Sequence, residues 1–315
     1  MASNNTTNHR MFFKLRDGYD IPVHIPAIVC IAASLLCAVA AITLSFRRKS
    51  YRTFFIKWSK SERLVVYLST CDALFSVSHL LDHIHIVITK DHVRPKELCA
   101  IYGFMLTVFI TAQVLIVNVV AINAFVMMYF NKKIFFGKYD SGLLVWTFGC
   151  RSSALLLQRS TGSLDQWEAR KCFIDALNGT VASLIFTTIP LPIIMTLNTL
   201  LYIMTWFKIR NQANNLKKTL GPLTRTANAP YKAARNMSMF VLALFVQWSF
   251  TAVFGSWAVI VKNPAKIPEV MHDFGLIFSN LGGIMNLVIF VKIRKNDQER
   301  PKHDRRINNK PATEA

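Results

Sequence analysis

Polar side chains that could bind a ligand or an ion occur at regular spacing inside a long apolar run in the first third of the chain. They are spaced by four, three and four residues: Asp72, Ser76, His79 and His83. A helix with this spacing places all of them on one face. Because ionisable groups are costly in hydrocarbon, they usually face the interior of a helix bundle. The pattern therefore predicts an inward-facing polar stripe, with Asp72 as its strongest candidate for a functional group.

Two other interpretations of this stripe stay open. Asp82 and His85 lie beside the two histidines, and such side chains three and four residues apart are suitable metal ligands. Histidines near a membrane interface more often make ordinary hydrogen bonds, so we expect ligand contacts here and no metal site. Asp72 could likewise be a carboxylate that only hydrogen-bonds across helices.

A second polar stripe is expected on the next apolar run, and later runs supply further candidates. Core packing explains the aromatic candidates equally well. The candidate ligand contacts are the residues expected to face the bundle interior: His79, His83, Thr107, Thr111, Trp248, Trp257 and Asp273. The candidate polar switch consists of the aspartate and its possible hydrogen-bond partners: Asp72, Gln113, Asn118, Ser279, Asn280 and Asn286.

The composition places these residues in a membrane protein. The chain of 315 residues is 52% apolar and 17% charged, and its 37 Lys and Arg residues cluster in short segments between apolar runs. A nucleic-acid-binding protein would instead carry its cations on a solvated face with aromatic platforms. No nucleophile and base pair, glycine-rich phosphate loop or metal-type cysteine spacing is present, so we expect neither an enzyme nor a nucleic-acid partner.

Six apolar runs are long enough to cross the hydrocarbon core: Ile25–Phe46, Leu64–Ile88, Leu98–Phe130, Val181–Phe207, Met237–Val261 and Val270–Val291. A seventh candidate, Gly142–Leu157, is short and carries Arg151 in its middle. Its apolar residues roughly offset the cost of the arginine, about 2.5 to 3.5 kcal/mol, so neighbouring helices must hold it in place. The segment Cys150–Arg170 is unusually rich in Ser and Arg, and an altered reading frame or splice junction is one hypothesis for it.

The distribution of Lys and Arg predicts the orientation. Cations gather in the segments after the first, third and fifth runs and after the last one, counting the weak candidate as fourth. The positive-inside rule places these segments in the cytoplasm, with the N-terminus outside and the C-terminus inside. Only an odd number of spans gives that result. We therefore expect an all-α membrane protein, a bundle of seven transmembrane helices with a short, atypical fourth span.

Features expected outside the cell agree with this orientation. Glycosylation sequons begin at Asn4, Asn5 and Asn178. Cys99 lies at the outer end of the third run and Cys172 in the loop before the fifth, so both are on the oxidising side and can form a disulfide, although two free thiols are the alternative.

The chain resembles the seven-transmembrane G-protein-coupled receptors over Pro22 to Lys295. Leu68-Ser69-Thr70-Cys71-Asp72 is similar to a motif of their second span, and Cys99 and Cys172 match their disulfide. The chain departs from the rhodopsin-like members at the inner end of span three, where it has Asn123-Ala124-Phe125. It is most similar to the cAMP-receptor-like and secretin-related small orphan receptors.

This resemblance implies a plasma-membrane receptor that passes an extracellular signal to a heterotrimeric G protein, with a possible sodium ion near Asp72. The domains expected are an outer tail (1–21), a receptor domain (22–295) and a disordered basic cytoplasmic tail (296–315). The inner cations would face the G protein and anionic membrane lipids: Lys132, Lys133, Lys208, Arg210, Lys217, Lys218 and Arg235. The alternative is a multi-span transporter or channel that uses the polar stripe on span two.

Overall fold

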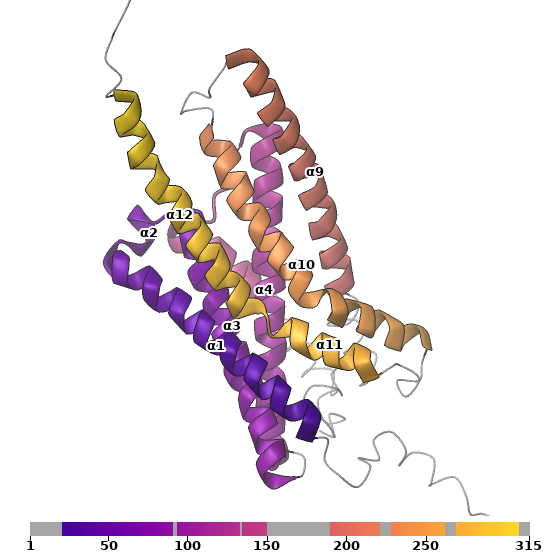
Figure 1. Ribbon diagram of the computed structural model, residues 1–315. Coiled ribbons are helices and arrows are strands. Elements are labelled where there is room, and N and C mark those ends of the chain that lie inside the picture. The colour runs from indigo at the N-terminus through magenta and orange to yellow at the C-terminus, as the bar shows by residue number, and fades with distance from the viewer. Residues whose placement is uncertain are drawn as a thin grey trace, which may run out of the picture.

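The computed structural model describes residues 21–90, 93–132, 134–149, 190–220, 228–261 and 269–308. These residues are helical, and no strand occurs among them (Figure 1). The helices have the following bounds: α1 (Ile21–Arg48), α2 (Phe54–Lys57), α3 (Lys60–Thr89), α4 (Lys96–Phe130), α5 (Ser141–Leu144), α9 (Pro190–Leu220), α10 (Asn228–Val261), α11 (Glu269–Ser279) and α12 (Gly282–Asn308). The all-α prediction is confirmed for this part of the chain.

Local sequence explains where the central helices begin and end. At the start of α3 the Ser59 hydroxyl accepts from the Glu62 backbone N–H, while the Glu62 carboxylate accepts from the Ser59 backbone N–H. This reciprocal pair satisfies two N–H groups that a helix terminus leaves without partners. Lys90 and Asn131 end α3 and α4 in the left-handed conformation, which closes the last helical turn.

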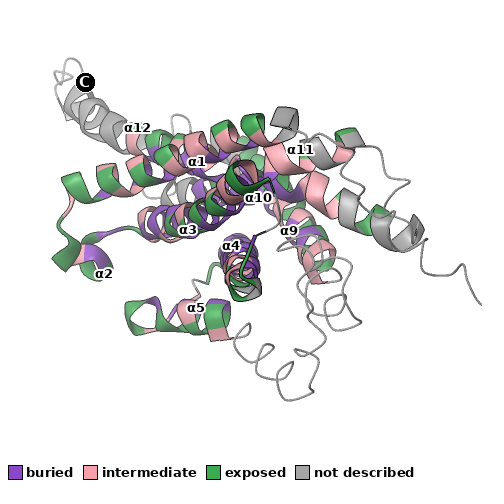
Figure 2. Cartoon of the chain, turned by 90° about the horizontal axis from the view of Figure 1, so that it is seen from below, coloured by how far each residue is buried: buried purple, intermediate pink, exposed green. Residues whose placement is uncertain are grey.

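The long helices form one bundle. α3 packs against α1, α4 and α12, and α4 also packs against α9 and α10, while α10 contacts α11. Figure 1 shows that α1, α4, α9 and α12 run in one direction along the bundle, whereas α3 and α10 run in the other. Seen along the bundle in Figure 2, buried residues concentrate on α3, α4 and α10, and much of α1 is exposed or intermediate.

Large apolar side chains from three helices fill the middle of the bundle. Leu64 and Phe75 of α3, Ile116 of α4, and Phe240 and Trp248 of α10 belong to one buried cluster. Trp248 is fully buried, and its ring lies edge-on to that of Phe75 at 5.8 Å between centroids. This packing fixes which faces of α3, α4 and α10 meet.

Five helices in the described residues are long and apolar enough to span a membrane: His24–Arg47, Lys60–Thr89, Glu97–Phe130, Pro190–Gln212 and Ala234–Val253. They coincide with the first, second, third, fifth and sixth predicted spans. The chain is therefore a multi-pass helical membrane protein, and the count of seven spans stays a prediction.

The two other predicted spans differ from expectation. Val270–Val291 is not one continuous helix, because α11 ends at Ser279 and α12 begins at Gly282. The weak span begins as the single turn of α5 followed by a π-helix over Val145–Gly149, and its remainder lies outside the described residues. α12 continues to Asn308, so part of the segment predicted to be a disordered tail is helical.

The predicted cytoplasmic segments meet at one end of the bundle, where α1, α4 and α9 end and α3 and α10 begin. Lys60 at the start of α3 donates to the Ile134 carbonyl after α4, at 2.7 Å. Lys208 of α9 lies over the ring of Tyr129 of α4, 5.2 Å from its centroid. We call this the basic end; the beginnings of α1 and α4 lie at the opposite end (Figure 1).

Candidate functional site

The Asp72 carboxylate lies at the centre of a buried polar network between four helices. Asp72 is 2% exposed and occupies the middle of α3. Gln113 of α4 donates to its Oδ1 at 2.9 Å, and Asn286 of α12 donates to its Oδ2. Gln247 of α10 adds a longer contact to Oδ1 at 3.5 Å. Hydrogen bonds satisfy the buried carboxylate, so the network connects α3, α4, α10 and α12.

Gln247 extends this network to the end of α11. Its amide nitrogen lies 3.2 Å from Gln113 Oε1 and 3.0 Å from the backbone carbonyl of Ser279. A carbonyl at a helix end has no partner within its own helix, so the glutamine satisfies a group that the break in the span exposes. Gln113, Ser279 and Asn286 were predicted as possible partners of Asp72, and all three belong to this network. Gln247 was not predicted.

The break between α11 and α12 allows close packing because glycines occupy it. A Cβ atom on Gly282 would lie 2.6 Å from Gln247 Nε2 and would overlap the Asp72 carboxylate. The next residue, Gly283, donates its backbone N–H to the Ser34 hydroxyl of α1 at 3.0 Å. Only residues without a side chain let α12 approach both α1 and α3 this closely.

The sodium ion implied by the family resemblance does not fit this arrangement. Hard cations bind oxygen ligands, whereas the groups that face the Asp72 carboxylate are the amide N–H donors of Gln113, Gln247 and Asn286. These donors use the carboxylate oxygens that a cation would need.

Three histidines form a hydrogen-bonded chain from the Asp72 region towards the opposite end. Asn280 donates to the Leu276 carbonyl at 2.7 Å, and its Oδ1 lies 3.2 Å from His79 Nδ1. His79 Nε2 lies 3.2 Å from His83 Nε2, and His83 Nδ1 lies 2.8 Å from His24 Nδ1 on α1. Because the Asn280 oxygen only accepts, neutral rings must all donate in one direction, from His24 to Asn280. If the proton of one ring moves to its other nitrogen, the donor at each of the other rings of the histidine chain must therefore change as well.

The predicted stripe on α3 is buried along its length, as its spacing indicated. Ser76 is 1% exposed, and His79 and His83 are also buried. Asp82 is buried beside them, and its Oδ1 has no hydrogen-bond partner in the described part of the chain. The described residues contain no group of three or more His, Cys, Asp or Glu side chains that is arranged to hold a metal ion.

The polar residues of the predicted stripe on α4 make two kinds of hydrogen bond, and their role as ligand contacts or polar switch stays a prediction. Thr107 and Thr111 are bonded through their hydroxyls to carbonyls one turn earlier in α4, at 2.6 and 2.8 Å. Asn118 does not reach Asp72; it donates to Asn198 Oδ1 of α9 at 2.9 Å. The stripe extends along a long helix, so Asn118, which lies closer to the basic end than the two threonines, faces α9 and not Asp72.

The aromatic candidates separate into an inner and an outer residue. Trp248 is fully buried in the core, and its indole N–H has no acceptor among the described residues. Trp257 is 42% exposed, so it lies on the outside of the bundle and does not join Trp248 in lining the interior. The backbone of Asp273 belongs to α11, and its side chain lies outside the described set.

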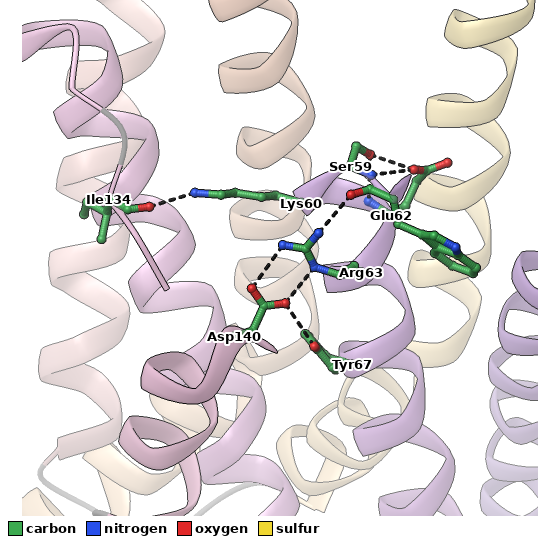
Figure 3. Close-up of polar contacts among 8 residues, drawn as sticks. Ser59, Lys60, Glu62, Arg63, Tyr67, Ile134 and Asp140 are labelled. Atoms are coloured by element: carbon green, nitrogen blue, oxygen red, sulfur yellow. Dashed lines mark hydrogen bonds and ion pairs between the residues drawn. The ribbon is translucent and has the colours of Figure 1, made fainter. Parts of the chain in front are cut away.

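A second polar cluster, which was not predicted, lies at the basic end (Figure 3). Arg63 of α3 binds Asp140 through two bonds, from Nε to Oδ2 at 2.7 Å and from Nη2 to Oδ1 at 3.0 Å. Tyr67 donates to the same Oδ2 at 3.0 Å, and Arg63 also donates to the Trp58 carbonyl at 2.8 Å. Bidentate arginine–carboxylate pairs are strong and directional, so this cluster fixes the segment after α4 to α3.

Asn123 connects the same segment to α10. Its Oδ1 accepts from the Ile134 backbone N–H at 3.0 Å, and its Nδ2 lies 3.2 Å from the sulfur of Met237. Asn123 is the first of the three residues, Asn123-Ala124-Phe125, at which the sequence departs from the rhodopsin-like receptors. It therefore contacts both the loop after α4 and the sixth predicted span.

The cations predicted to face a G protein differ in exposure. Lys132, Arg210 and Arg235 are exposed, whereas Lys208 is partly buried against Tyr129. Lys133 and the side chains of Lys217 and Lys218 lie outside the described residues. The exposed members leave the basic end accessible to an acidic partner.

The predicted extracellular features fall largely outside the described residues. These are the three sequon asparagines and one cysteine: Asn4, Asn5, Asn178 and Cys172. Cys99 is disulfide-bonded, and Cys30, Cys37 and Cys71 are free. The partner of Cys99 is thus not among the described cysteines, and its pairing with Cys172 stays a prediction.

No protein-family model matches the chain, and no curated protein is significantly similar to it. The geometry of the two polar clusters therefore carries the functional argument.

Proposed function

We propose that this chain is a seven-span receptor of the plasma membrane that couples an extracellular ligand to a cytoplasmic heterotrimeric G protein. The observation that carries the proposal is the Asp72 network. It joins α3, α4, α10 and α12 at one buried carboxylate, next to the break between α11 and α12. A movement of any one of these helices changes the hydrogen bonds of the other three.

The histidine chain provides the path from the outer side to this network. His24, His83 and His79 lead to Asn280, which stands in the break, two residues before Gly282. A ligand that binds one of these imidazoles better in one packing of α1 and α3 shifts the population towards that packing. Asn280 then transmits the change to the break, where Gly282 contacts Asp72.

The response at the inner side is a rearrangement of the basic end, and it needs no catalysis. Arg63 and Asp140 hold the loop after α4 against α3, and Asn123 holds it near α10. Two packings that differ in these contacts would expose different surfaces to a G protein. The N-terminus is outside and the C-terminus inside in this proposal, as the positive-inside rule predicts.

A transporter is the second candidate, and the broken span favours it. Discontinuous helices that meet a buried ionisable residue near the middle of the membrane are common at transporter substrate and ion sites. α11 and α12 meet Asp72 in this way. The amide N–H groups around Asp72 argue against a cation site in the packing described here.

Measuring G-protein activation in cells with a panel of candidate ligands distinguishes a receptor from a transporter. Unpermeabilised cells are stained in parallel for an N-terminal tag. A receptor gives outer staining and ligand-dependent or constitutive activation that Asp72→Asn reduces at equal surface level. The control Ser256→Ala removes an exposed hydroxyl that bonds only its own helix and should leave activation unchanged. Surface protein without activation but with measurable solute flux would establish the transporter instead.

A further inference from the structure

A pocket of about 430 Å³ lies at the basic end between α1, α3 and α12. Its volume falls in the range of about 300 to 1,000 Å³ that is typical of small-molecule sites. Val65, Phe290 and Ile293 contribute apolar walls, and Lys49, Glu62 and Arg294 contribute charge. The pocket therefore combines an apolar interior with a polar, positively charged rim.

Most of the charge in this pocket is already neutralised, except at Arg294. Lys49 binds both oxygens of the Glu62 carboxylate at 2.7 and 2.8 Å, and the Ser59 backbone and hydroxyl also donate to that carboxylate. Within the described residues Arg294 has no hydrogen-bond or ion-pair partner. The three ionisable groups leave a net charge of +1 that is centred on the guanidinium.

The indole ring of Trp58 lines the same pocket. The Trp58 side chain is 4% exposed, and its Nε1 has no acceptor among the described residues. The N–H is sealed within the protein, so a ligand in the pocket meets the indole ring and not its N–H. Lys49 lies 5.9 Å from the centroid of the same ring, which keeps positive charge close to this wall of the pocket.

The height of the pocket in the bundle matches the boundary between hydrocarbon and lipid headgroups. Lys49 lies just beyond the membrane-spanning part of α1, and Trp58 lies just before that of α3. Tryptophan and arginine are typical of this boundary, and basic pockets between helices on the cytoplasmic side bind the headgroups of anionic lipids.

We propose that this pocket binds an anionic phospholipid of the inner leaflet, whose phosphate accepts hydrogen bonds from Arg294. The acyl chains lie along the apolar wall formed by Phe290 and Ile293. A net charge of −1, as in phosphatidylserine, complements the +1 of the pocket. The choice of the inner leaflet rests on the proposed orientation, with the basic end in the cytoplasm, and the site does not depend on receptor activity.

Native mass spectrometry of the full-length protein in detergent tests this site by resolving the protein with no, one or two bound lipids. We expect the first phosphatidylserine to bind more tightly than phosphatidylcholine. Arg294→Gln should weaken that first binding step about five-fold, as expected for one cation near the membrane surface.

The control is Lys292→Gln, which removes an exposed cation two residues away on α12 that does not line the pocket. Its first phosphatidylserine should bind as in the unmodified protein. Equal weakening by Lys292→Gln and Arg294→Gln would overturn the proposal, because general surface charge would then explain the binding. Equal affinity for the two lipids would also overturn it. Displacement by soluble glycerophosphoserine as effective as that by the lipid would show a free-anion site in place of a lipid site.

Discussion

Asp72 and Gly282 are in such close contact that a methyl group on the glycine would overlap the carboxylate of the aspartate. The two residues lie on α3 and at the first position of α12, so the break in the last span packs directly against the buried charge. This contact is the structural basis for expecting that α12 and the Asp72 network move together.

Gly282→Ala should disrupt the network, because its Cβ would lie 2.6 Å from Gln247 Nε2 and 2.8 Å from Asp72 Cγ. Overpacking of this kind costs about 1 to 3 kcal/mol. The matched control is Gly275→Ala on α11, where the nearest atom to a new Cβ is Thr251 Oγ1 at 4.0 Å. In thermal unfolding of the purified proteins Gly282→Ala should lower the midpoint, and Gly275→Ala should leave it unchanged or raise it. Equal effects would mean that the contact is unimportant.

Two buried aspartates on α3 should respond in opposite ways to substitution by asparagine. Asp72 accepts from three amides, so Asp72→Asn places an NH₂ group against an N–H donor and should lower the unfolding free energy by about 1 to 3 kcal/mol. The Asp82 Oδ1 has no partner in the described residues, so Asp82→Asn should leave stability unchanged or increase it. The two unfolding midpoints are compared in one detergent, and a similar loss in both variants would refute the assigned network.

The two ion pairs at the basic end should differ in coupling energy. The Arg63 and Asp140 side chains are 11% and 6% exposed, whereas those of Lys49 and Glu62 are 40% and 22% exposed. A double-mutant cycle with Arg63→Gln and Asp140→Asn should give a coupling of about 1.5 kcal/mol or more. A cycle with Lys49→Gln and Glu62→Gln should give about 0 to 1 kcal/mol, because an exposed pair is screened by water. Coupling in the Arg63 cycle as small as in the Lys49 cycle would contradict the bidentate contact.

Cys99 should be found in a disulfide with Cys172, which would hold the loop before the fifth predicted span over the mouth of the bundle. Mass spectrometry of unreduced peptides should identify a linked pair that contains both residues. Cys99→Ser and Cys172→Ser should then lower surface expression to the same extent, and Cys150→Ser should not. A peptide that links Cys99 to Cys150 would show that the predicted pairing is wrong.

Helical periodicity was sufficient to predict that one polar stripe of α3 is buried. Asp72, Ser76, His79 and His83 repeat at three and four residues, and an apolar run allows only the bundle interior as their location. Gln113 and Asn286 could be proposed as partners because they too interrupt apolar runs. Gln247 satisfies the same criterion, but its contact with Asp72 depends on the rotation of α10 about its axis, which periodicity alone does not determine.

The cluster at the basic end could not be predicted in the same way. Arg63 lies outside the apolar run Leu64–Ile88, among the cations that predict the orientation. Asp140 follows Tyr139 in the left-handed backbone conformation, at φ values of 58° and 59°, and this turn brings its carboxylate to α3. One signal was present, because Asp140 is the only acid in the segment from Asn131 to Ser141. The break in the last span had a signal as well, in the pair Gly282-Gly283.

Nucleotide exchange by a purified heterotrimeric G protein, with the chain reconstituted in lipid nanodiscs, tests the receptor proposal most directly. The proposal predicts that the chain accelerates exchange, either alone or with one member of a ligand panel, and that Gly282→Ala reduces the acceleration while Gly275→Ala does not. Monodisperse protein that never accelerates exchange, but moves a solute across liposomes in an Asp72-dependent way, would contradict the receptor proposal.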